Sequence, residues 1–313
     1  MRLPIRLIAL CLLVAAAAPA FAAAQKDHDD CNSTDVERNI AGCTRVAEDT
    51  SESDKVRAIA YVGRALALDR KGERDRAMAD LTAAIRLNPN DSLAFSDRGI
   101  LWRETGDVDR AIADFTEALR LSPLPHSDLA GPGHVNVYAN RALAWWAKGD
   151  LDHALADFDA ALAQDPKDVE ARYHRAQIRM ARRDLVDAVA DLDAVIALDP
   201  AIADAHYLRG AAHYDLYMYA RPWLDPRDLD LAIADFSDVI ARNPTRAAAY
   251  FARGLAYTIA ADHPRAIADL TRAVELNPVD TDAVAALKAL KPDYQPPRNP
   301  VADWADQTPK GEK

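Results

Sequence analysis

The chain contains 313 residues, of which 50% are hydrophobic and 28% are charged, and its formal net charge is −11. This length is too great for one small core and suits an array of stacked units. The acidic balance argues against nucleic acid and anionic membranes as partners, because both attract basic stripes that the sequence lacks. Only 11 residues are glycine and 7% are aromatic, which favours packed helices over sheets.

Residues 1–24 have the organisation of a secretory signal peptide. Arg2 and Arg6 precede a short apolar run, and small residues around Ala22 offer a cleavage site. The run is shorter than the roughly 20 residues that span a bilayer. We therefore predict an exported protein, periplasmic or secreted, with no membrane insertion after cleavage; an uncleaved anchor is the alternative. Cleavage would change the net charge to −13, because two arginines and no acid are removed.

Residues 25–57 are expected to form an N-terminal half-repeat. One helix is predicted there, with Thr34 and Glu37 as its capping box. Cys31 and Cys43 are the cysteines that remain after signal cleavage, and such a pair in an exported protein indicates a disulfide bond. A redox or metal site is the alternative, but the sequence offers neither a Cys-x-x-Cys spacing nor a nearby histidine pair.

The middle of the chain contains six copies of one pattern. Residues 109–123 read DRAIADFTEALRLSP, and residues 264–278 read PRAIADLTRAVELNP. Each copy is an amphipathic helical segment closed by a proline, and these prolines are 34 residues apart, or 43 and 44 where residues are inserted. The pattern predicts a stack of helix pairs. The predicted repeats 1 to 6 are 58–91, 92–125, 135–168, 169–202, 203–246 and 247–280, followed by a capping helix at 281–290.

A 34-residue period with two helical segments resembles the tetratricopeptide repeat family. That family favours bulky residues at positions 4, 11 and 24, small residues at 8, 20 and 27, and proline at 32. Repeat 1 matches these positions with Tyr61, Ala65, Leu68, Ala77, Leu81, Ala84 and Pro89. Repeats 4 and 5 depart from the pattern, since positions 4 and 11 hold Arg172, Arg179, His206 and His213. The resemblance implies an all-α, right-handed superhelical solenoid of antiparallel helix pairs, with about six repeats between the half-repeat and the capping helix.

The repeated residue types agree with such packing on physical grounds. Small residues at positions 8, 20 and 27 let two antiparallel helices approach closely, and bulky residues at 4, 11 and 24 fill the gaps between successive repeats. Gly72, Gly106 and Gly149 fall in the turn inside three repeats, where we expect a left-handed residue to end the first helix.

Two charged positions repeat more strictly than the family requires. Position 7 is arginine in every repeat: Arg64, Arg98, Arg141, Arg175, Arg209 and Arg253. Position 23 is aspartate in every repeat: Asp80, Asp114, Asp157, Asp191, Asp235 and Asp269. The two positions lie almost level in an antiparallel hairpin, so we interpret them as a structural ladder of ion pairs. A charged binding track is the alternative, although matched charges leave little net field for a ligand.

The ends and insertions are less regular. The first insertion lies between repeats 2 and 3, and the second lengthens the first helix of repeat 5 at 216–225. The second adds Tyr217, Tyr219 and Trp223, which either pack on a neighbouring helix or form a contact site. Residues 291–313 are rich in proline and are predicted to be a mostly disordered tail.

The resemblance implies a groove lined by the first helices, at positions 5, 9 and 12. The predicted groove residues are Val62, Leu66, Ser96, Ile100, Arg103, Leu143, Trp146, Tyr173, Gln177, Met180, Tyr207, Tyr214, Phe251 and Leu255. This set is largely apolar and aromatic, which suits an amphipathic helix or an extended apolar peptide. It lacks the lysine, asparagine and arginine set with which many family members bind a terminal carboxylate. Some of these side chains are expected to pack only against each other.

These features together predict a non-catalytic adaptor or scaffold of the cell envelope that binds a protein or peptide partner. The main alternative is a structural module that forms homo-oligomers through an array end or the aromatic insertion. An enzyme is the third possibility. It ranks last because the sequence contains no nucleotide-binding, hydrolase or metalloprotease motif, so an active site would have to form without one. No cofactor and no metal are expected.

Overall fold

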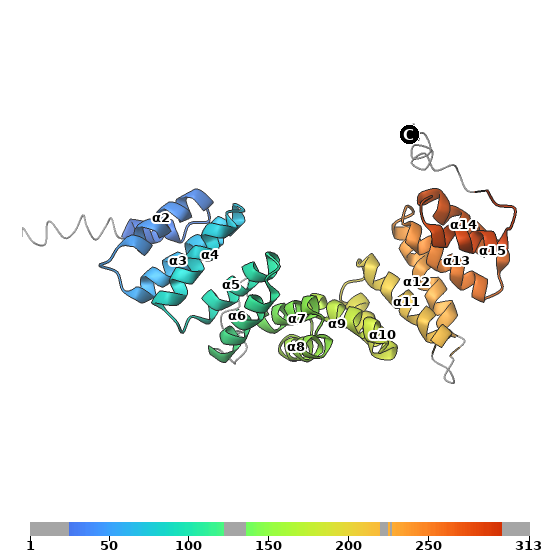
Figure 1. Ribbon diagram of the computed structural model, residues 1–313, viewed down its shortest axis with the longest axis horizontal. Helices are drawn as coiled ribbons and strands as arrows, with labels where there is room; N and C mark the ends of the chain where they lie inside the picture. Colours follow the sequence, from blue (N-terminus) through green and yellow to red (C-terminus); the bar gives the residue numbers. More distant parts are fainter. Residues whose placement is uncertain (1–24, 122–135, 220–224, 226, 296–313) are drawn as a thin grey trace, which may run out of the picture. The chain divides into compact units, whose positions relative to one another are not determined.

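The computed structural model describes residues 25–121, 136–219, 225 and 227–295, and every regular element within these ranges is an α-helix (Figure 1). The chain divides into an N-terminal unit, Met1–Gln164, and a C-terminal unit, Asp165–Lys313. The predicted signal peptide, the first insertion and most of the proline-rich tail lie outside the described residues. The all-α class and the helix pairs predicted from the sequence are confirmed.

The N-terminal unit contains repeats 1 to 3 and the segment before them, and helices that follow each other in the chain lie side by side. After the helical residues 25–31, its helices are α2 (Val36–Glu48), α3 (Asp54–Arg70), α4 (Arg74–Leu87), α5 (Ser92–Glu104), α6 (Val108–Leu121), α7 (Val137–Lys148) and α8 (Leu151–Gln164).

The C-terminal unit repeats this arrangement with repeats 4 to 6 and a last single helix. Its helices are α9 (Val169–Arg182), α10 (Leu185–Leu198), α11 (Ala203–Tyr219), α12 (Arg227–Arg242), α13 (Ala247–Ile259), α14 (His263–Leu276) and α15 (Thr281–Leu290). Helix α11 has 17 residues, whereas the corresponding helix α9 of repeat 4 has 14, so the insertion in repeat 5 extends the first helix.

The turns inside repeats 1, 2, 3, 4 and 6 each use one left-handed residue. The predicted left-handed conformation of Gly72, Gly106 and Gly149 is confirmed, with φ of 79°, 85° and 86°. Arg183 and Ala261 occupy the same position in repeats 4 and 6 and also have positive φ, 67° and 58°. A residue with a Cβ atom costs about 1 kcal/mol or more in this conformation, so these two turns are strained relative to the glycine turns.

The core of each repeat forms where small residues face bulky ones. The position-24 side chains Phe115, Phe158 and Phe236 are at most 1% exposed. A Cβ atom added to Gly99 would lie 2.8 Å from the ring of Phe115, so position 8 must be small for the two helices of repeat 2 to pack. Truncating one of these phenylalanines to alanine would cost about 3–5 kcal/mol, because the rigid helices cannot close the cavity.

The N-terminal end differs from its prediction in two respects. Residues 25–31 are helical, so the predicted helix, α2, has a helical partner before it. A Cβ atom on Gly42 of α2 would overlap the backbone of Cys31, which shows how closely the two segments pack. The expected capping box at Thr34 is wrong: α2 starts one residue later, and the N-cap is Asp35, whose carboxylate accepts a hydrogen bond from the Arg38 amide at 2.8 Å.

Candidate functional site

Each position-7 arginine forms a bidentate ion pair with the position-23 aspartate of its own repeat. Its Nε and Nη2 atoms donate to the two carboxylate oxygens at 2.5–3.0 Å in all six repeats. The six aspartate side chains are only 3–9% exposed. A buried carboxylate requires such a partner, because an unpaired charge away from water is strongly destabilising.

The same arginines also donate hydrogen bonds to side chains of the preceding segment. These contacts were not predicted from the sequence. In the N-terminal unit the Nη1 atoms of Arg64, Arg98 and Arg141 donate to threonine hydroxyls at 3.0, 3.3 and 3.1 Å. In the C-terminal unit Arg209 donates to Asp193 at 2.5 Å and Arg253 donates to Ser237 at 2.9 Å. These acceptors stand at position 25 of the preceding segment: Thr44, Thr82, Thr116, Asp193 and Ser237. The sequence does hold a signal for these acceptors: position 25, one residue after the buried position 24, has a side chain with an oxygen that can accept a hydrogen bond.

Aromatic side chains at position 4 lie against the ladder. The guanidinium carbons of Arg64, Arg98, Arg141 and Arg253 lie 5.3–5.9 Å from the ring centroids of Tyr61, Phe95, Tyr138 and Tyr250. Hydrogen bonding to Asp80 raises the pKa of Arg64, and bonding to Asp269 raises the pKa of Arg253, so both guanidinium groups keep their charge. The ladder is therefore anchored by a carboxylate, a neighbouring acceptor and, in four repeats, an aromatic ring.

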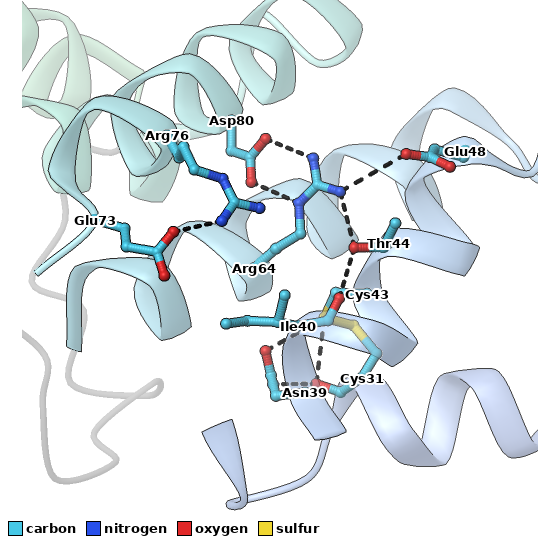
Figure 2. A network of polar contacts seen from close by, with 10 residues as sticks. All are labelled: Cys31, Asn39, Ile40, Cys43, Thr44, Glu48, Arg64, Glu73, Arg76 and Asp80. Atoms are coloured by element: carbon cyan, nitrogen blue, oxygen red, sulfur yellow. Dashed lines mark hydrogen bonds and ion pairs between the residues drawn. A yellow bond between two sulfur atoms is a disulfide. The ribbon is translucent and has the colours of Figure 1, made fainter. Parts of the chain in front are cut away.

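The Arg64–Asp80 pair of repeat 1 lies next to the cysteine pair at the N-terminal end, because Arg64 also binds Thr44, the residue after Cys43 (Figure 2). Cys31 and Cys43 are connected by a disulfide bond in the structure, with 4.4 Å between their Cα atoms. The next residue is Thr44, whose hydroxyl donates to the Ile40 carbonyl and accepts from Arg64. A Cβ atom on Gly63 would lie 3.2 Å from the Cys43 sulfur, so the bridge packs directly against α3. Formation of this bridge in the purified protein remains a prediction.

The predicted groove residues fall in both units, and each unit is described by itself. Most of them are half-buried side chains on the first helices. Leu66 is the most open, with 44% exposure, whereas Ser96 is only 4% exposed and presents little surface to a ligand. Val62, Ile100, Tyr173 and Phe251 pack partly against core side chains.

Helix α3 carries an apolar row whose two end residues are exposed to solvent. Ile59, Val62 and Leu66 follow one another at helical spacing, and Ile59 and Leu66 are 57% and 44% exposed. On the next first helix, α5, Leu93 is 37% exposed and Ile100 is half-buried. Ile59 and Leu93 occupy position 2 of their repeats, which the sequence reading left out of the groove.

The predicted groove tyrosines of the C-terminal unit lie near a charged pair. Arg246 lies over the ring of Tyr207, with its guanidinium carbon 4.3 Å from the centroid, and donates to Asp204 at 2.5 Å. Burial raises the pKa of Tyr207, and burial with the nearby charge of Asp204 raises the pKa of Tyr173. Both phenols are therefore neutral at physiological pH, and Arg246 covers part of one of them.

The extended end of α11 forms a second aromatic surface. Tyr219 is 63% exposed, and the guanidinium carbon of Arg183 lies 4.9 Å from its ring centroid. Arg183 also donates to Asp215 at 2.9 Å. Tyr217 is half-buried, and Trp223 of the predicted cluster lies outside the described residues. The strained left-handed turn at Arg183 thus places its side chain beside the aromatic end of α11.

The two histidines of repeat 5 are paired with carboxylates. His213 Nδ1 lies 2.8 Å from Asp228 Oδ1, and His206 Nδ1 lies 3.3 Å from Asp238 Oδ2. Across the part of the chain that the structure describes, no three histidine, cysteine or acidic side chains gather in a way that could hold a metal ion. In that same part, no helix has the length and apolar character needed to cross a membrane.

The helical hairpins and their shared small and bulky positions define a helical repeat protein of the solenoid class. The tetratricopeptide repeat model matches residues 62–124, 139–201 and 224–281, which together cover more than half of the chain. The chain therefore belongs to the tetratricopeptide repeat family.

Solved structures with the same fold are similar at low identity. A tetratricopeptide repeat protein from Cytophaga hutchinsonii aligns over 85% of this chain and 99% of its own C-terminal part, with a TM-score of 0.64 and 17% identity. YrrB, described as having an unusual peptide-binding site, aligns over 66% of this chain and 97% of its own, with a TM-score of 0.56 and 20% identity. A protein from Parabacteroides merdae aligns over 85% and 96%, with a TM-score of 0.52 and 18% identity. No curated protein matches the sequence.

Proposed function

We propose that this protein is a non-catalytic adaptor of the cell envelope that binds a segment of a partner protein along the first helices of its repeats. The observation that carries the proposal is the apolar row of Ile59, Val62 and Leu66 on α3, together with the aliphatic side chains Leu93 and Ile100 at the equivalent positions of α5. Rows of exposed aliphatic side chains on a regular surface are typical of protein contact sites. Membership of the tetratricopeptide repeat family and the peptide-binding site described for YrrB support this assignment.

The C-terminal unit offers a different contact chemistry. Tyr173 and Tyr207 present half-buried rings close to the Asp204–Arg246 pair, and Phe251 presents a third half-buried ring on α13. Tyrosine rings contribute large contact areas with little loss of side-chain entropy. The net charge of −11 favours a partner segment with an apolar centre and basic flanks, because opposite charges accelerate association.

Placement in the envelope is supported by two features of the chain. The organisation of residues 1–24 is that of a secretory signal peptide, and they precede the cysteine pair of the first helices. Disulfide bonds persist in oxidising compartments and are rare in the cytosol. A non-catalytic role agrees with the pairing of the buried ladder carboxylates, which occupies the most abundant buried titratable groups.

The test compares two leucines of similar exposure. Leu66 on α3, the first helix of repeat 1, is 44% exposed, and Leu231 on α12, the second helix of repeat 5, is 46% exposed. A photo-cross-linking residue is placed at each position in turn, and the protein captured from envelope extract at position 66 but not at position 231 is taken as the partner. Binding of that partner is then measured for Leu66→Ser and Leu231→Ser. We expect Leu66→Ser to weaken binding by roughly tenfold to thirtyfold, as for an apolar contact residue worth ~1.5–2 kcal/mol, and Leu231→Ser to bind like the wild type. Equal binding by both folded variants would contradict a site on the first helices.

Self-association is the second candidate, and the exposed Tyr219 favours it. A tyrosine that is 63% exposed at a helix end can pack on the same surface of a second copy. Sedimentation of the pure protein separates the two functions, since a dimer that Tyr219→Ser dissociates and Leu66→Ser leaves intact would support the structural role.

A further inference from the structure

Repeat 4 replaces two bulky residues by arginine, and the structure shows where these arginines point. Arg172 and Arg179 take positions 4 and 11 of α9, which are Tyr61 and Leu68 in repeat 1. Both guanidinium groups turn toward Asp191 on α10: Arg172 Nη1 lies 3.5 Å from Oδ1, and Arg179 Nη1 lies 2.6 Å from Oδ2.

Asp191 is already the ladder partner of Arg175, so three guanidinium groups share one carboxylate. Its side chain is 3% exposed, and Arg175 Nη2 donates to it at 2.5 Å. Among the described residues, no other carboxylate lies within ion-pair distance of Arg172 or Arg179. The two arginines therefore bring two further positive charges to a carboxylate that Arg175 already binds. Their side chains are only 19% and 21% exposed, so water screens this charge incompletely.

The hydrogen-bond donors of the two arginines are also incompletely used. Arg172 Nη2 donates to the Pro166 carbonyl, but its Nε atom is buried without an acceptor. The hydrogen bonds of Arg179 within the described residues all use Nη1, to Asp191 and to the Asp187 carbonyl. Its Nε and Nη2 atoms thus have no acceptor there and are not among the fully buried polar atoms. A ladder arginine such as Arg98, in contrast, donates through all three nitrogens.

We propose that Arg172 and Arg179 bind an oxyanion of the phosphate type on the α9–α10 hairpin. Two guanidinium groups whose shared carboxylate is already bound by Arg175 suit a dianion better than a singly charged carboxylate. Guanidinium groups bind tetrahedral oxyanions through paired N–H donors, and the open nitrogens of Arg179 supply such donors. This site uses positions 4 and 11 and is independent of the groove positions 5, 9 and 12, so it stands or falls separately from partner binding.

The experiment is calorimetric titration of the full chain with inorganic phosphate, at an ionic strength held constant with chloride. We expect saturable binding at one site, and acetate should bind at least about tenfold more weakly because it carries half the charge. O-phosphoserine tests the source of the ligand: binding equal to that of phosphate indicates a phosphate monoester on a larger molecule, and much weaker binding indicates the free ion. A wild-type protein that gives no saturable phosphate binding overturns the proposal.

The variants Arg172→Tyr and Arg179→Leu introduce chemistry that repeat 1 already uses at these positions. Each should weaken phosphate binding by about tenfold or more, the effect of losing one charged hydrogen-bond donor. Arg120→Leu is the matched control, because it removes one arginine from the exposed face of α6. Where a leucine variant fails to fold, Arg179→Gln and the phosphate-dependent rise of the unfolding temperature replace it. Variants that bind phosphate like the wild type would refute the assignment.

Discussion

Removing one rung of the ladder should unfold the array more easily, and Arg141→Ala is the sharpest test. Arg141 donates to both oxygens of Asp157 at 2.7 Å, and Asp157 is 8% exposed. The variant leaves this carboxylate without a charged partner in a place that water hardly reaches. Breaking a buried ion pair from one side costs about 3–5 kcal/mol, and the 19% exposure of Arg141 places the expected loss near 3 kcal/mol.

The assay is urea unfolding of the full chain, followed by circular dichroism at the helix band. Arg120→Ala is the control, since Arg120 pairs with Glu117 on an exposed helix surface and its loss should cost about 0–1 kcal/mol. A combined variant, Arg141→Leu with Asp157→Leu, should recover much of the loss, because no charge is then left unpaired.

Two results would refute this reasoning. If Arg141→Ala were no less stable than Arg120→Ala, the ladder would not support the fold. If Arg141→Ala kept its stability but lost its partner, the ladder would be a charged binding track. The hydroxyl of Thr116, which accepts from Arg141 Nη1 at 3.1 Å, offers a finer test, since Thr116→Val removes one hydrogen bond worth about 1 kcal/mol.

Two further predictions concern the N-terminal unit. Protein purified from the cell envelope should lack residues 1–24 and yield linked Cys31 and Cys43 peptides in a non-reduced digest, and reduction of a bridge with a sequence separation of 12 should cost about 3 kcal/mol; free thiols would contradict the pairing. Burial raises the pKa of Asp97 to about 7, with Asp91 adding to the effect. Because the folded state holds this proton more tightly than the unfolded state, stability should fall as the pH rises from about 4 to about 7. Asp97→Asn should then be more stable by on the order of 2 kcal/mol above about pH 7, with no gain near pH 4, whereas a gain independent of pH would exclude this cause.

The ladder could be predicted from the sequence because two residue identities recur without exception in hairpins of fixed geometry. The hydrogen bonds from the ladder arginines to position 25 of the preceding segment were not predicted, because position 25 repeats only a chemical property and not one residue type. Thr82 and Asp193 look unrelated as letters, yet both present an oxygen to a guanidinium group one repeat later. Reading each position by what it can donate or accept would have found the acceptors.

The ends and the groove were harder to predict because periodicity does not reach them. Ser33, Thr34 and Asp35 are all good N-cap residues, so residue type alone could not show that α2 begins after Asp35. In the groove, the environment of Tyr207 depends on Arg246, which lies just before repeat 6 and outside the repeated positions. Spacing predicts which face a side chain shares but not which neighbour covers it.

The geometry of the Arg–Asp pairs also supports the interpretation that the ladder is structural and not a ligand site. The Nε and Nη2 atoms of Arg98 donate to Asp114, and Nη1 donates to Thr82 in the preceding repeat. A ligand would have to displace a bond that closes the hairpin or one that joins two repeats, and in a stack held by nearest-neighbour contacts either loss destabilises the array. All three donor nitrogens of Arg98 are therefore engaged in contacts that hold the stack together. Arg179 differs, because its bonds across the hairpin all use Nη1, so an anion can bind its Nε and Nη2 atoms without displacing them.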